Sequence, residues 1–409
     1  MRIRRFARAW WLIAVIAAGL VSAGPSSGKV AEPMPSGWSV VPTPNPGYYG
    51  NILWGVGARN SADAWAVGVK ATQTSNDTLA LHWNGQAWTA VPTPNPGGDC
   101  QDGDILWGGN ALTAVAPVSA NDVWAVGSDC YSANTIIEHW NGSAWSLVAS
   151  PRWKGWGWDS TAALYGVTAV SASDIWAVGY RGASGIQTLV EHYDGSAWSD
   201  VVAAGGQSGY LSGISATGPN DVWAVGATDT GNLVEHYDGT SWSIVPTPQP
   251  GTNSGLYSVS ALSPTDVWAV GSKSGAGPGS ATFALHWNGT TWTEVPSPNP
   301  SSSPSARNDL NGVVALAPGN VWAVGTYRNA QTNFHQDRTL TMHWDGADWT
   351  IVDSPTPGAT GQLTSIAATA SHVDARGERA KLFIAGFFSQ YERNIYDGHY
   401  TLPQTLVMR

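Results

Sequence analysis

The sequence predicts an all-β fold, a seven-bladed β-propeller of four-stranded blades whose ring is closed by the N-terminal strand. Three observations predict it. A Trp-Ala-Val-Gly element recurs along the chain, and a second tryptophan follows each copy after an Asn-Gly or Asp-Gly pair. An incomplete unit ends the chain, and its missing strand stands near the N-terminus. The repeat spacing, from the middle forties to about sixty residues, is in the range of propeller blades rather than of helical repeats.

The first residues predict export. Four arginines stand within the first eight residues, an apolar stretch runs from Trp10 to Val21, and two small residues follow. We therefore expect a signal peptide over 1–23 and a short linker over 24–36. An uncleaved anchor is the alternative, but the apolar stretch is shorter than the roughly 20 residues that span a bilayer. No other segment is long and apolar enough to span a membrane, so we expect a secreted or extracellular protein, with attachment to the cell surface left open.

Residues 37–409 are expected to form one propeller domain. Removing the signal peptide takes away four positive charges and no negative ones, which moves the formal net charge from −10 to −14. Such a chain lacks the basic face that a nucleic-acid partner needs. Glycine, serine, threonine and asparagine are plentiful, as in proteins of many strands joined by turns. We expect a monomer.

Each unit divides into four short strands, A to D, and the clearest copy spans 164–198. Strand A, Leu-x-Gly-Val-x-Ala, is rich in small residues because the innermost strands of a propeller crowd around its axis. Strand B, Asp-Val-Trp-Ala-Val-Gly, is apolar at successive positions because neighbouring blades cover both of its faces. Strand C is Leu-x-x-His-Trp and strand D is Trp-x-x-Val-Pro. The strand B tryptophans are Trp65, Trp124, Trp176, Trp223, Trp268 and Trp322, and the strand D tryptophans are Trp88, Trp145, Trp198, Trp242, Trp292 and Trp349.

Turn residues separate the strands. Asn-Gly or Asp-Gly stands between strands C and D in all six complete units, at positions 84, 141, 194, 238, 288 and 345. These pairs supply the positive φ angles of a tight hairpin. The Pro-Thr-Pro-Asn-Pro-Gly stretch after strand D cannot continue a strand, so it becomes the crossover to the next blade.

The two ends of the chain complete a seventh unit. Residues 363–368 match strand A, 382–386 match strand B with Phe383 in place of the tryptophan, and 405–408 match strand C. The missing strand D is present at 37–44. A ring closed in this way exposes no open sheet edge at its ends.

These units resemble kelch-like propellers, of the kind found in the central domain of galactose oxidase. The resemblance rests on a strand ending in glycine, an aromatic residue on the next strand, a turn, and a tryptophan opening the fourth strand, and it covers essentially the whole mature chain. The units differ in carrying one glycine after strand B rather than a Gly-Gly pair, and in a shorter turn before the last tryptophan. The Asp-Gly-x-x-Trp pieces also resemble a contracted Asp-box turn of sialidase-type propellers. Both resemblances imply the fold and leave the activity open.

One histidine recurs on strand C of every complete unit. A catalytic histidine is needed once, so this repetition predicts a structural role. The aspartate that precedes strand B is a plausible hydrogen-bond partner for the imidazole. Unit six carries Asn320 at that position, and an Asx turn would explain aspartate and asparagine equally well.

A meander of four strands sorts the loops onto two faces of the disc. The D-to-A connectors and B-to-C loops share one face, here called the loop face, and the A-to-B and C-to-D turns share the other, the turn face. We expect every long and irregular loop on the loop face, where propellers commonly bind ligands at the mouth of the central channel. The candidate ligand-binding residues are Tyr49, Trp54, Trp107, Arg152, Trp153, Trp156, Trp158, Asp159, Arg181, Tyr327, Arg328 and His335.

Aromatic rings beside a few polar groups can stack on sugars or anchor a protein. Three tryptophans in the polar, glycine-rich segment 152–159 favour binding there. For any single ring, the alternative is that it fills a gap between blades.

Cys100 and Cys130 are the two cysteines of the chain. They fall in loops on the same face of adjacent blades, and export implies an oxidising compartment, so we expect a disulfide. The three aspartates at 99, 102 and 104 fit no calcium-binding loop, and a solvated acidic turn explains them. No zinc-ligand spacing, nucleophile elbow, phosphate-binding loop or cofactor fingerprint is present, so we expect no metal and no cofactor.

Three functions remain open. The first is a non-enzymatic extracellular recognition module that binds a glycan or another surface ligand through the loop face, and the lack of a single acid, base and nucleophile set favours it. The second is a carbohydrate-active hydrolase or lyase that uses Asp159, His335 or arginines near the channel, which two carboxylates about 5 to 10 Å apart would support. The third is a protein-interaction scaffold, which a wide, flat apolar patch would indicate.

Overall fold

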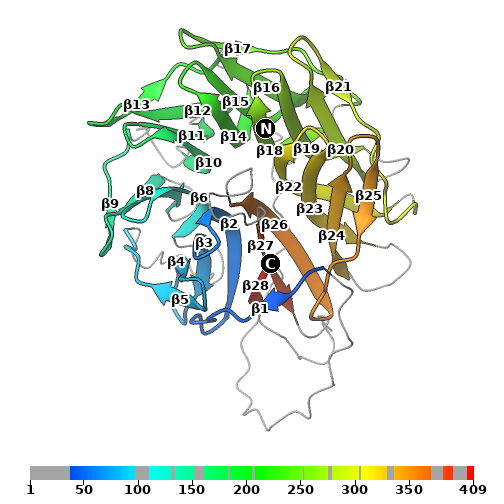
Figure 1. Cartoon of the computed structure of the whole chain (residues 1–409). Helices are drawn as coiled ribbons and strands as arrows, with labels where there is room; N and C mark the ends of the chain where they lie inside the picture. The colour runs from blue at the N-terminus through cyan, green and yellow to red at the C-terminus, as the bar shows by residue number, and fades with distance from the viewer. Residues whose placement is uncertain are drawn as a thin grey trace.

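The computed structural model describes residues 37–96, 110–129, 134–151, 161–182, 185–204, 208–251, 253–274, 279–303, 305–328, 336–369, 381–389 and 403–409. Its strands form seven four-stranded antiparallel sheets, arranged as blades around a central axis (Figure 1). The described residues contain no helix that is long and apolar enough to cross a membrane.

Blades 1 to 6 follow one another along the chain, each running from its inner strand A to its outer strand D. Blades 1 and 2 comprise β2 (Gly50–Asn60), β3 (Asp63–Ala71), β4 (Asn76–Trp83), β5 (Trp88–Val91), β6 (Ala111–Ser119), β7 (Asp122–Ser128), β8 (Thr135–Trp140) and β9 (Trp145–Leu147). Blades 3 and 4 comprise β10 (Thr161–Ser171), β11 (Asp174–Gly182), β12 (Ile186–Tyr193), β13 (Trp198–Val201), β14 (Gly209–Gly218), β15 (Asp221–Thr228), β16 (Gly231–Tyr237) and β17 (Trp242–Ile244). Blades 5 and 6 comprise β18 (Gly255–Ser263), β19 (Asp266–Ser274), β20 (Ser280–Trp287), β21 (Trp292–Glu294), β22 (Arg307–Ala317), β23 (Asn320–Arg328), β24 (Asp337–Trp344) and β25 (Trp349–Val352).

Blade 7 joins the two ends of the chain, as the sequence predicts. It comprises β26 (Thr360–Ala368), β27 (Leu382–Ser389), β28 (Gln404–Met408) and, as its outer strand, the N-terminal β1 (Val40–Val41). Beyond the two paired residues of β1, Ser39 and Arg409 exchange backbone hydrogen bonds of 3.1 and 3.0 Å. The predicted fold class is therefore confirmed, including the closing strand.

A threonine at the start of strand C ties the closing strand further. The amide of Thr405 donates to Asn45 Oδ1 over 2.8 Å, and its hydroxyl lies 2.7 Å from that of Thr43. In blade 1, Thr78 makes the same two contacts to Asn95 and Thr93 within one continuous strand pair. The Pro-Thr-Pro-Asn connector therefore serves as a clasp between strands C and D, and blade 7 uses that clasp to close the ring.

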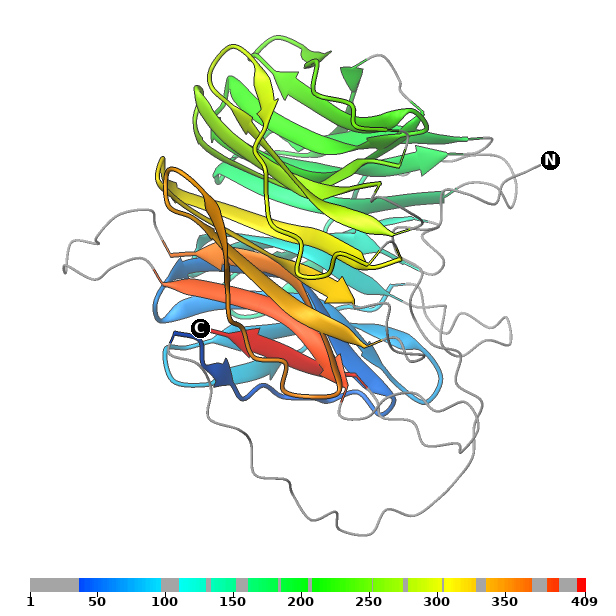
Figure 2. The ribbon, with the colours of Figure 1, turned by 90° about the vertical axis from the view of Figure 1, so that its right-hand side faces the viewer.

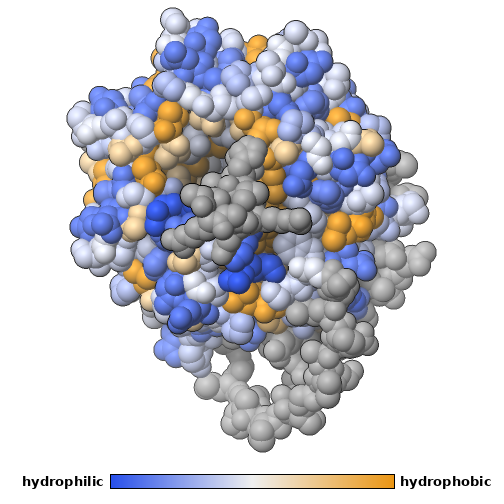
Figure 3. Space-filling model, in the orientation of Figure 1, coloured by the Kyte–Doolittle hydropathy of each residue, from blue (hydrophilic) through white to orange (hydrophobic). Residues whose placement is uncertain are grey.

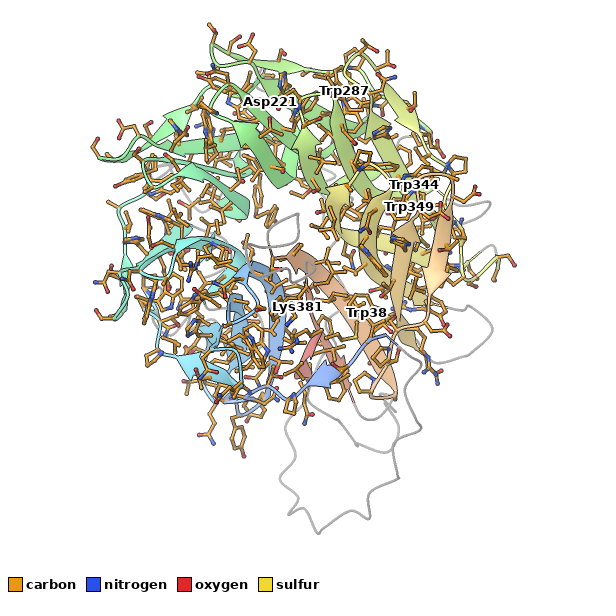
Figure 4. All side chains as sticks on the ribbon, in the orientation of Figure 1. Trp38, Asp221, Trp287, Trp344, Trp349 and Lys381 are labelled. Atoms are coloured by element: carbon orange, nitrogen blue, oxygen red, sulfur yellow. The ribbon has the colours of Figure 1, made fainter. Side chains whose placement is uncertain are left out.

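Aromatic rings join each blade to the next. The strand B tryptophan stacks on the histidine of its own blade, with centroids 4.4 Å apart for Trp65 and His82, and it contacts Trp140 and Trp145 of the following blade at 5.1 and 5.2 Å. This series of aromatic contacts includes the blade that joins the two chain ends, because Trp38 lies edge-on to Trp322 of blade 6, with centroids 5.4 Å apart. Figure 4 shows Trp38 beside the closing blade and Trp344 next to Trp349 on the outer strands of blade 6.

The repeated histidine is structural, as predicted. In blades 1 to 5 its Nε2 lies 2.7 to 3.0 Å from an oxygen of the aspartate that begins strand B. In blade 6 the partner is Asn320 Oδ1, at 2.9 Å from His343. Because an amide oxygen can only accept a hydrogen bond, Nε2 of His343 carries the proton in blade 6. Asparagine is therefore a hydrogen-bond acceptor for the histidine, as aspartate is in the other blades.

The glycine of each Trp-Ala-Val-Gly element lies inside strand B, which continues beyond it, and close backbone packing requires it there. A Cβ atom placed on Gly68, or on its counterpart in any of the other six blades, would lie 1.8 to 2.0 Å from a carbonyl oxygen of strand A. No side chain fits at that distance, so the contact explains the glycine in Trp-Ala-Val-Gly without invoking a special φ angle.

The two faces of the disc differ, with one correction to the prediction. In blades 1 to 6 the A-to-B turns have two residues and the C-to-D turns have four, and all lie on the turn face. In blade 7, however, β26 ends at Ala368 and β27 begins at Leu382, so one long connection also belongs to the turn face. The expectation that every long loop lies on the loop face was therefore wrong for this blade. In Figure 2, which shows the disc edge-on, the C-terminus marks the turn face on the left.

Apolar side chains on the described part of the turn face are scattered in small groups between polar ones (Figure 3). The most exposed large apolar residues belong to, or lie next to, the strands of five different blades: Tyr48, Leu147, Val202, Ile244 and Ile351. A wide, flat apolar patch, which would point to a protein-interaction scaffold, is not formed by these residues.

Candidate functional site

The inner strands of all seven blades line a cavity of about 310 Å³. That volume lies at the lower end of the range of small-molecule sites, so it suits a single small end-group rather than a long ligand. Every blade contributes residues from the same stretch of strand A, and the B strand of blade 7 adds Phe387.

A bulge in strand A brings one residue per blade to the cavity. In blade 1, Leu53 pairs with Gly68, the next paired residue is Gly55, and Trp54 between them is left out of register. The same shift follows the corresponding leucine in every other blade. A bulge re-aims the extra side chain. The bulged residues, all of which line the cavity, are Trp54, Thr113, Tyr165, Ser212, Tyr257, Asn311 and Thr364.

Four of these bulged residues are short and polar, and they hold neighbouring blades together. Each donates a hydrogen bond to the carbonyl of the leucine in the next blade, as Thr113 does to Leu164 over 2.7 Å and Ser212 to Leu256 over 2.6 Å. The other two bonds run from Asn311 to Leu363 over 2.7 Å and from Thr364 to Leu53 over 2.9 Å. Since these donors are used within the ring, their first role is structural.

The other three bulged residues are aromatic, and they stand in alternate blades 1, 3 and 5. Trp54 lies edge-on to Phe387 of blade 7, with centroids 6.0 Å apart. Tyr257 donates to or accepts from Ser272 Oγ over 2.8 Å. All three bulged rings are partly exposed and line the cavity. They are therefore positioned to pack against a ligand in the channel.

Below the bulges, seven β-branched side chains form an apolar ring. They occupy one repeat position, two residues after the bulge, and all line the cavity: Val56, Val115, Val167, Ile214, Val259, Val313 and Ile366. This ring gives the inner part of the cavity an apolar wall. The polar side chains that line the cavity belong to the bulged residues and to the mouth.

The mouth on the loop face carries charged and amide groups from blades 6 and 7. Arg307 begins β22 and lines the cavity, and its Nε is ion-paired with Asp309 Oδ2. Asp337, at the start of β24, accepts from Arg328 Nε over 2.6 Å and from Gln362 Nε2 over 2.6 Å. Both aspartates are buried, so the ion pairs fix the arginines at this rim.

Burial and neighbours shift the pKa values of groups around the channel. Burial raises the pKa of Tyr165 well above 10, helped by Tyr180 and Tyr210, and burial raises the pKa of Tyr210 to about 12. Burial alone would lower the pKa of Arg307, but the charge and hydrogen bond of Asp309 raise it above its ordinary value. The phenols therefore stay neutral and Arg307 stays charged at physiological pH.

The structure describes five of the predicted ligand-binding residues. Trp54 lines the cavity, and Tyr49 packs edge-on against Tyr48, a residue whose side chain is exposed. Arg181 is ion-paired with Asp200 over 2.8 Å.

Tyr327 packs against the apolar core shared by blades 5 and 6, and Arg328 pairs with Asp337. The other predicted residues lie outside the described part of the chain: Trp107, Arg152, Trp153, Trp156, Trp158, Asp159 and His335, together with Cys100 and Cys130 of the predicted disulfide.

Sequence reasoning missed Tyr165, Tyr257, Arg307 and Gln362 in the cavity wall. A signal for the two tyrosines was present, because the residue after the strand A leucine varies between blades while its neighbours repeat. Arg307 and Gln362 stand earlier in strand A. No position there repeats clearly enough between blades to predict which way its side chain points.

Three buried glutamates occupy one position on strand C of blades 2, 3 and 4. Glu138, Glu191 and Glu235 are all fully buried, where other blades carry leucine or methionine. Glu191 accepts from Ser150 over 3.2 Å and Glu235 from the Ala204 amide over 3.1 Å. Burial raises the pKa of Glu138 to about 8, that of Glu191 to about 8 and that of Glu235 to about 7.

No three histidine, cysteine or acidic side chains within the described ranges are grouped so that they could hold a metal ion. The three glutamates stand on separate blades, each beside its own blade interface, and the two aspartates at the mouth are held by arginines.

Solved structures share the propeller fold. The chain is similar to YCF48 from Cyanidioschyzon merolae, with a TM-score of 0.50 and 15% identity over 91% of this chain and 98% of that one. A structure of YCF48 bound to D1 peptide gives 0.52 and 15% over 94% and 99%. The GH74 xyloglucanase from Xanthomonas campestris gives 0.50 and 14% over 91% of this chain and 55% of the enzyme. At these identities the likeness shows the fold alone.

No protein-family model matches the chain, and no curated protein matches it either. The seven-bladed propeller is supported by the structure and by its structural neighbours, whereas the kelch-like resemblance stays a prediction.

Proposed function

We propose that this chain is a non-enzymatic extracellular recognition propeller that binds a glycan at the mouth of its central channel, on the loop face. The observation that carries the proposal is the set of three half-buried rings, Trp54, Tyr165 and Tyr257, on alternate blades around one cavity. Aromatic faces pack on the C–H faces of sugars, and the side-chain oxygens of the bulged residues between them can accept hydrogen bonds from sugar hydroxyls.

The chemistry at the mouth supports binding over hydrolysis. A glycoside hydrolase uses two carboxyl groups, one of them a proton donor. Asp309 and Asp337 stand near the channel, but each is committed to an ion pair with an arginine, and Asp309 also accepts from Ser280 over 2.7 Å. This arrangement suits a rigid rim better than a proton-transferring pair.

Export and monomeric state belong to the same proposal. The arginine-rich, apolar N-terminal stretch supports secretion or display at the cell surface. The predicted aromatic loop 152–159 and the predicted disulfide lie outside the described residues and remain part of this proposal as features expected on the loop face.

A glycan array tests the proposal with the purified mature protein beside two variants. Trp54→Ala removes a ring that lines the cavity, and we expect it to weaken binding about tenfold, the usual effect of losing one stacking contact. Leu147→Ala, on the exposed outer strand of blade 2, is the matched control and should bind as the parent does. Equal binding by the Trp54 variant, or no glycan bound by any form, would contradict the proposed site or function.

A further inference from the structure

We propose that the bound glycan presents a carboxylate, as a uronic acid does, and that Arg307 recognises it. This inference rests on the proposed function and names its ligand class. Among the described residues that line the cavity, Arg307 is the one charged side chain. A cavity with a single guanidinium beside aromatic rings fits a sugar that carries one negative charge on its ring.

The geometry of Arg307 leaves part of its guanidinium for a ligand. Within the described chain it makes one ion pair, through Nε to Asp309 Oδ2, and Asp309 is held in turn by Ser280. The two terminal amino groups thus remain for the channel, and the side chain keeps 29% of its surface exposed. A guanidinium oriented by one fixed pair is well suited to bind a second carboxylate, because less side-chain freedom is lost on binding.

The charge around Arg307 is locally less unfavourable to an anion. Nine lysine and arginine residues lie in the described ranges, and three of them, Arg307, Arg328 and Arg338, belong to the loop-face ends of blade 6. The buried Asp309 and Asp337 pair with Arg307 and Arg328, and Asp353 after β25 offsets Arg338, so this rim carries no net negative charge. On a chain of net negative charge, such a rim repels a carboxylate less than the rest of the surface does.

A sugar carboxylate fits this cavity better than a peptide carboxylate does. A peptide terminus would need donors and acceptors for its backbone, whereas four of the seven bulged side chains already bond to the leucine carbonyls of the ring. A uronic acid needs an aromatic face, one cation and a few hydroxyl partners, which Tyr257, Arg307 and Gln362 supply from adjacent blades.

The experiment compares acidic oligosaccharides with their neutral counterparts by titration calorimetry. The probes are galacturonate, glucuronate and mannuronate oligomers, and the same oligomers with each carboxylate reduced to a primary alcohol. We expect the parent protein to bind at least one acidic oligomer about tenfold or more tightly than its reduced form, as a charge-assisted pair requires.

Variants assign that preference to Arg307. Arg307→Gln leaves Asp309 buried without its partner and can disturb folding, so the double variant R307Q/D309N removes the pair as a whole. We expect it to bind acidic and reduced oligomers equally. Arg59→Gln is the matched control, because Arg59 makes the same Nε contact to Asp63 on the turn face, over 2.7 Å. It should keep the parent's preference.

Each outcome decides between the two proposals. Equal affinity of the parent for acidic and reduced oligomers, or a preference that survives in R307Q/D309N, would overturn the role of Arg307 and leave the recognition function in place. Binding of peptides with a free C-terminal carboxylate in place of any sugar would overturn both proposals. About tenfold weaker binding by Trp54→Ala that keeps the acidic preference, together with loss of the preference in R307Q/D309N, would support both.

Discussion

Replacing the buried Glu138 by leucine should stabilise the protein, and the gain should grow with pH. Leucine stands at the same position in blades 1 and 5, as Leu81 and Leu285. On strand β8, Glu138 shares its face with Ile136, which packs in the core between blades 1 and 2. Within the described residues, neither carboxyl oxygen of Glu138 has a hydrogen-bond partner. The substitution therefore removes a buried polar group and no contact that holds the blades together.

The magnitude follows from the two pKa values of this carboxyl group. Burial raises the pKa of Glu138 from an ordinary 4.5 to about 8. Between these values the folded state keeps a proton that the unfolded chain releases. The contribution of this carboxyl group to the free energy of unfolding is therefore greatest below pH 4.5 and falls as the pH rises to 8. Each pH unit costs about 1.36 kcal/mol, so the loss is about 3 kcal/mol at pH 7 and about 5 kcal/mol at pH 8.

Urea unfolding at pH 5 and pH 8, followed by tryptophan fluorescence, measures the effect. Between pH 5 and pH 8, the free energy of unfolding of Glu138→Leu should fall by about 4 kcal/mol less than that of the parent. Glu138→Gln is the control, since it keeps the shape and polarity but does not titrate, and it should flatten the pH dependence equally. If both variants keep the parent's slope, Glu138 has the same pKa in the folded and the unfolded chain and the reasoning fails.

Substitutions at three further sites test the repeated contacts, each by the free energy of unfolding in urea. Asp174→Asn should be tolerated within about 1 kcal/mol, because Asn320 fills the same role in blade 6, whereas Asp174→Ala should cost about 1 to 3 kcal/mol. Gly179→Ala should cost about 3 kcal/mol, because its Cβ would lie 1.8 Å from a carbonyl oxygen, while Gly185→Ala, with nothing within 4 Å, should be nearly neutral. Asn45→Ala should cost about 1 kcal/mol and raise hydrogen exchange first in blade 7, and uniform exchange across all blades would contradict the clasp.

Much of the fold could be predicted because each blade repeats the same local chemistry. The Asn-Gly and Asp-Gly turns predicted from the sequence hold their glycines at positive φ, as at Gly85 with φ of 93° and Gly195 with 91°. The pairing of the two chain ends could be predicted because each fragment matches a different part of one unit. Repetition supplied six independent copies of each local signal, so one irregular copy, such as Phe383, did not obscure the pattern.

The candidate site was harder to predict because a bulge decides which side chains reach it. In a regular strand, side chains alternate between the two faces of a blade, and none is aimed specifically at the axis. The register shift after Leu164 breaks this alternation and brings Tyr165 to the cavity, but no turn residue marks a bulge of this kind in the sequence. Trp54 was selected because tryptophan outside a repeat position is conspicuous, whereas a tyrosine after leucine is not.

The ring is asymmetric in its titrating groups, and this separates stability from binding. The buried glutamates lie in blades 2 to 4, whereas the charged rim of the cavity belongs to blades 6 and 7. Raising the pH from 6 to 8 ionises Glu138 and Glu235 more, while Arg307 keeps its charge because Asp309 raises its pKa. We therefore expect affinity for an acidic oligosaccharide to stay constant over this range while the free energy of unfolding falls. An affinity that fell in parallel with stability would instead place the ligand's contacts on the glutamate side of the ring.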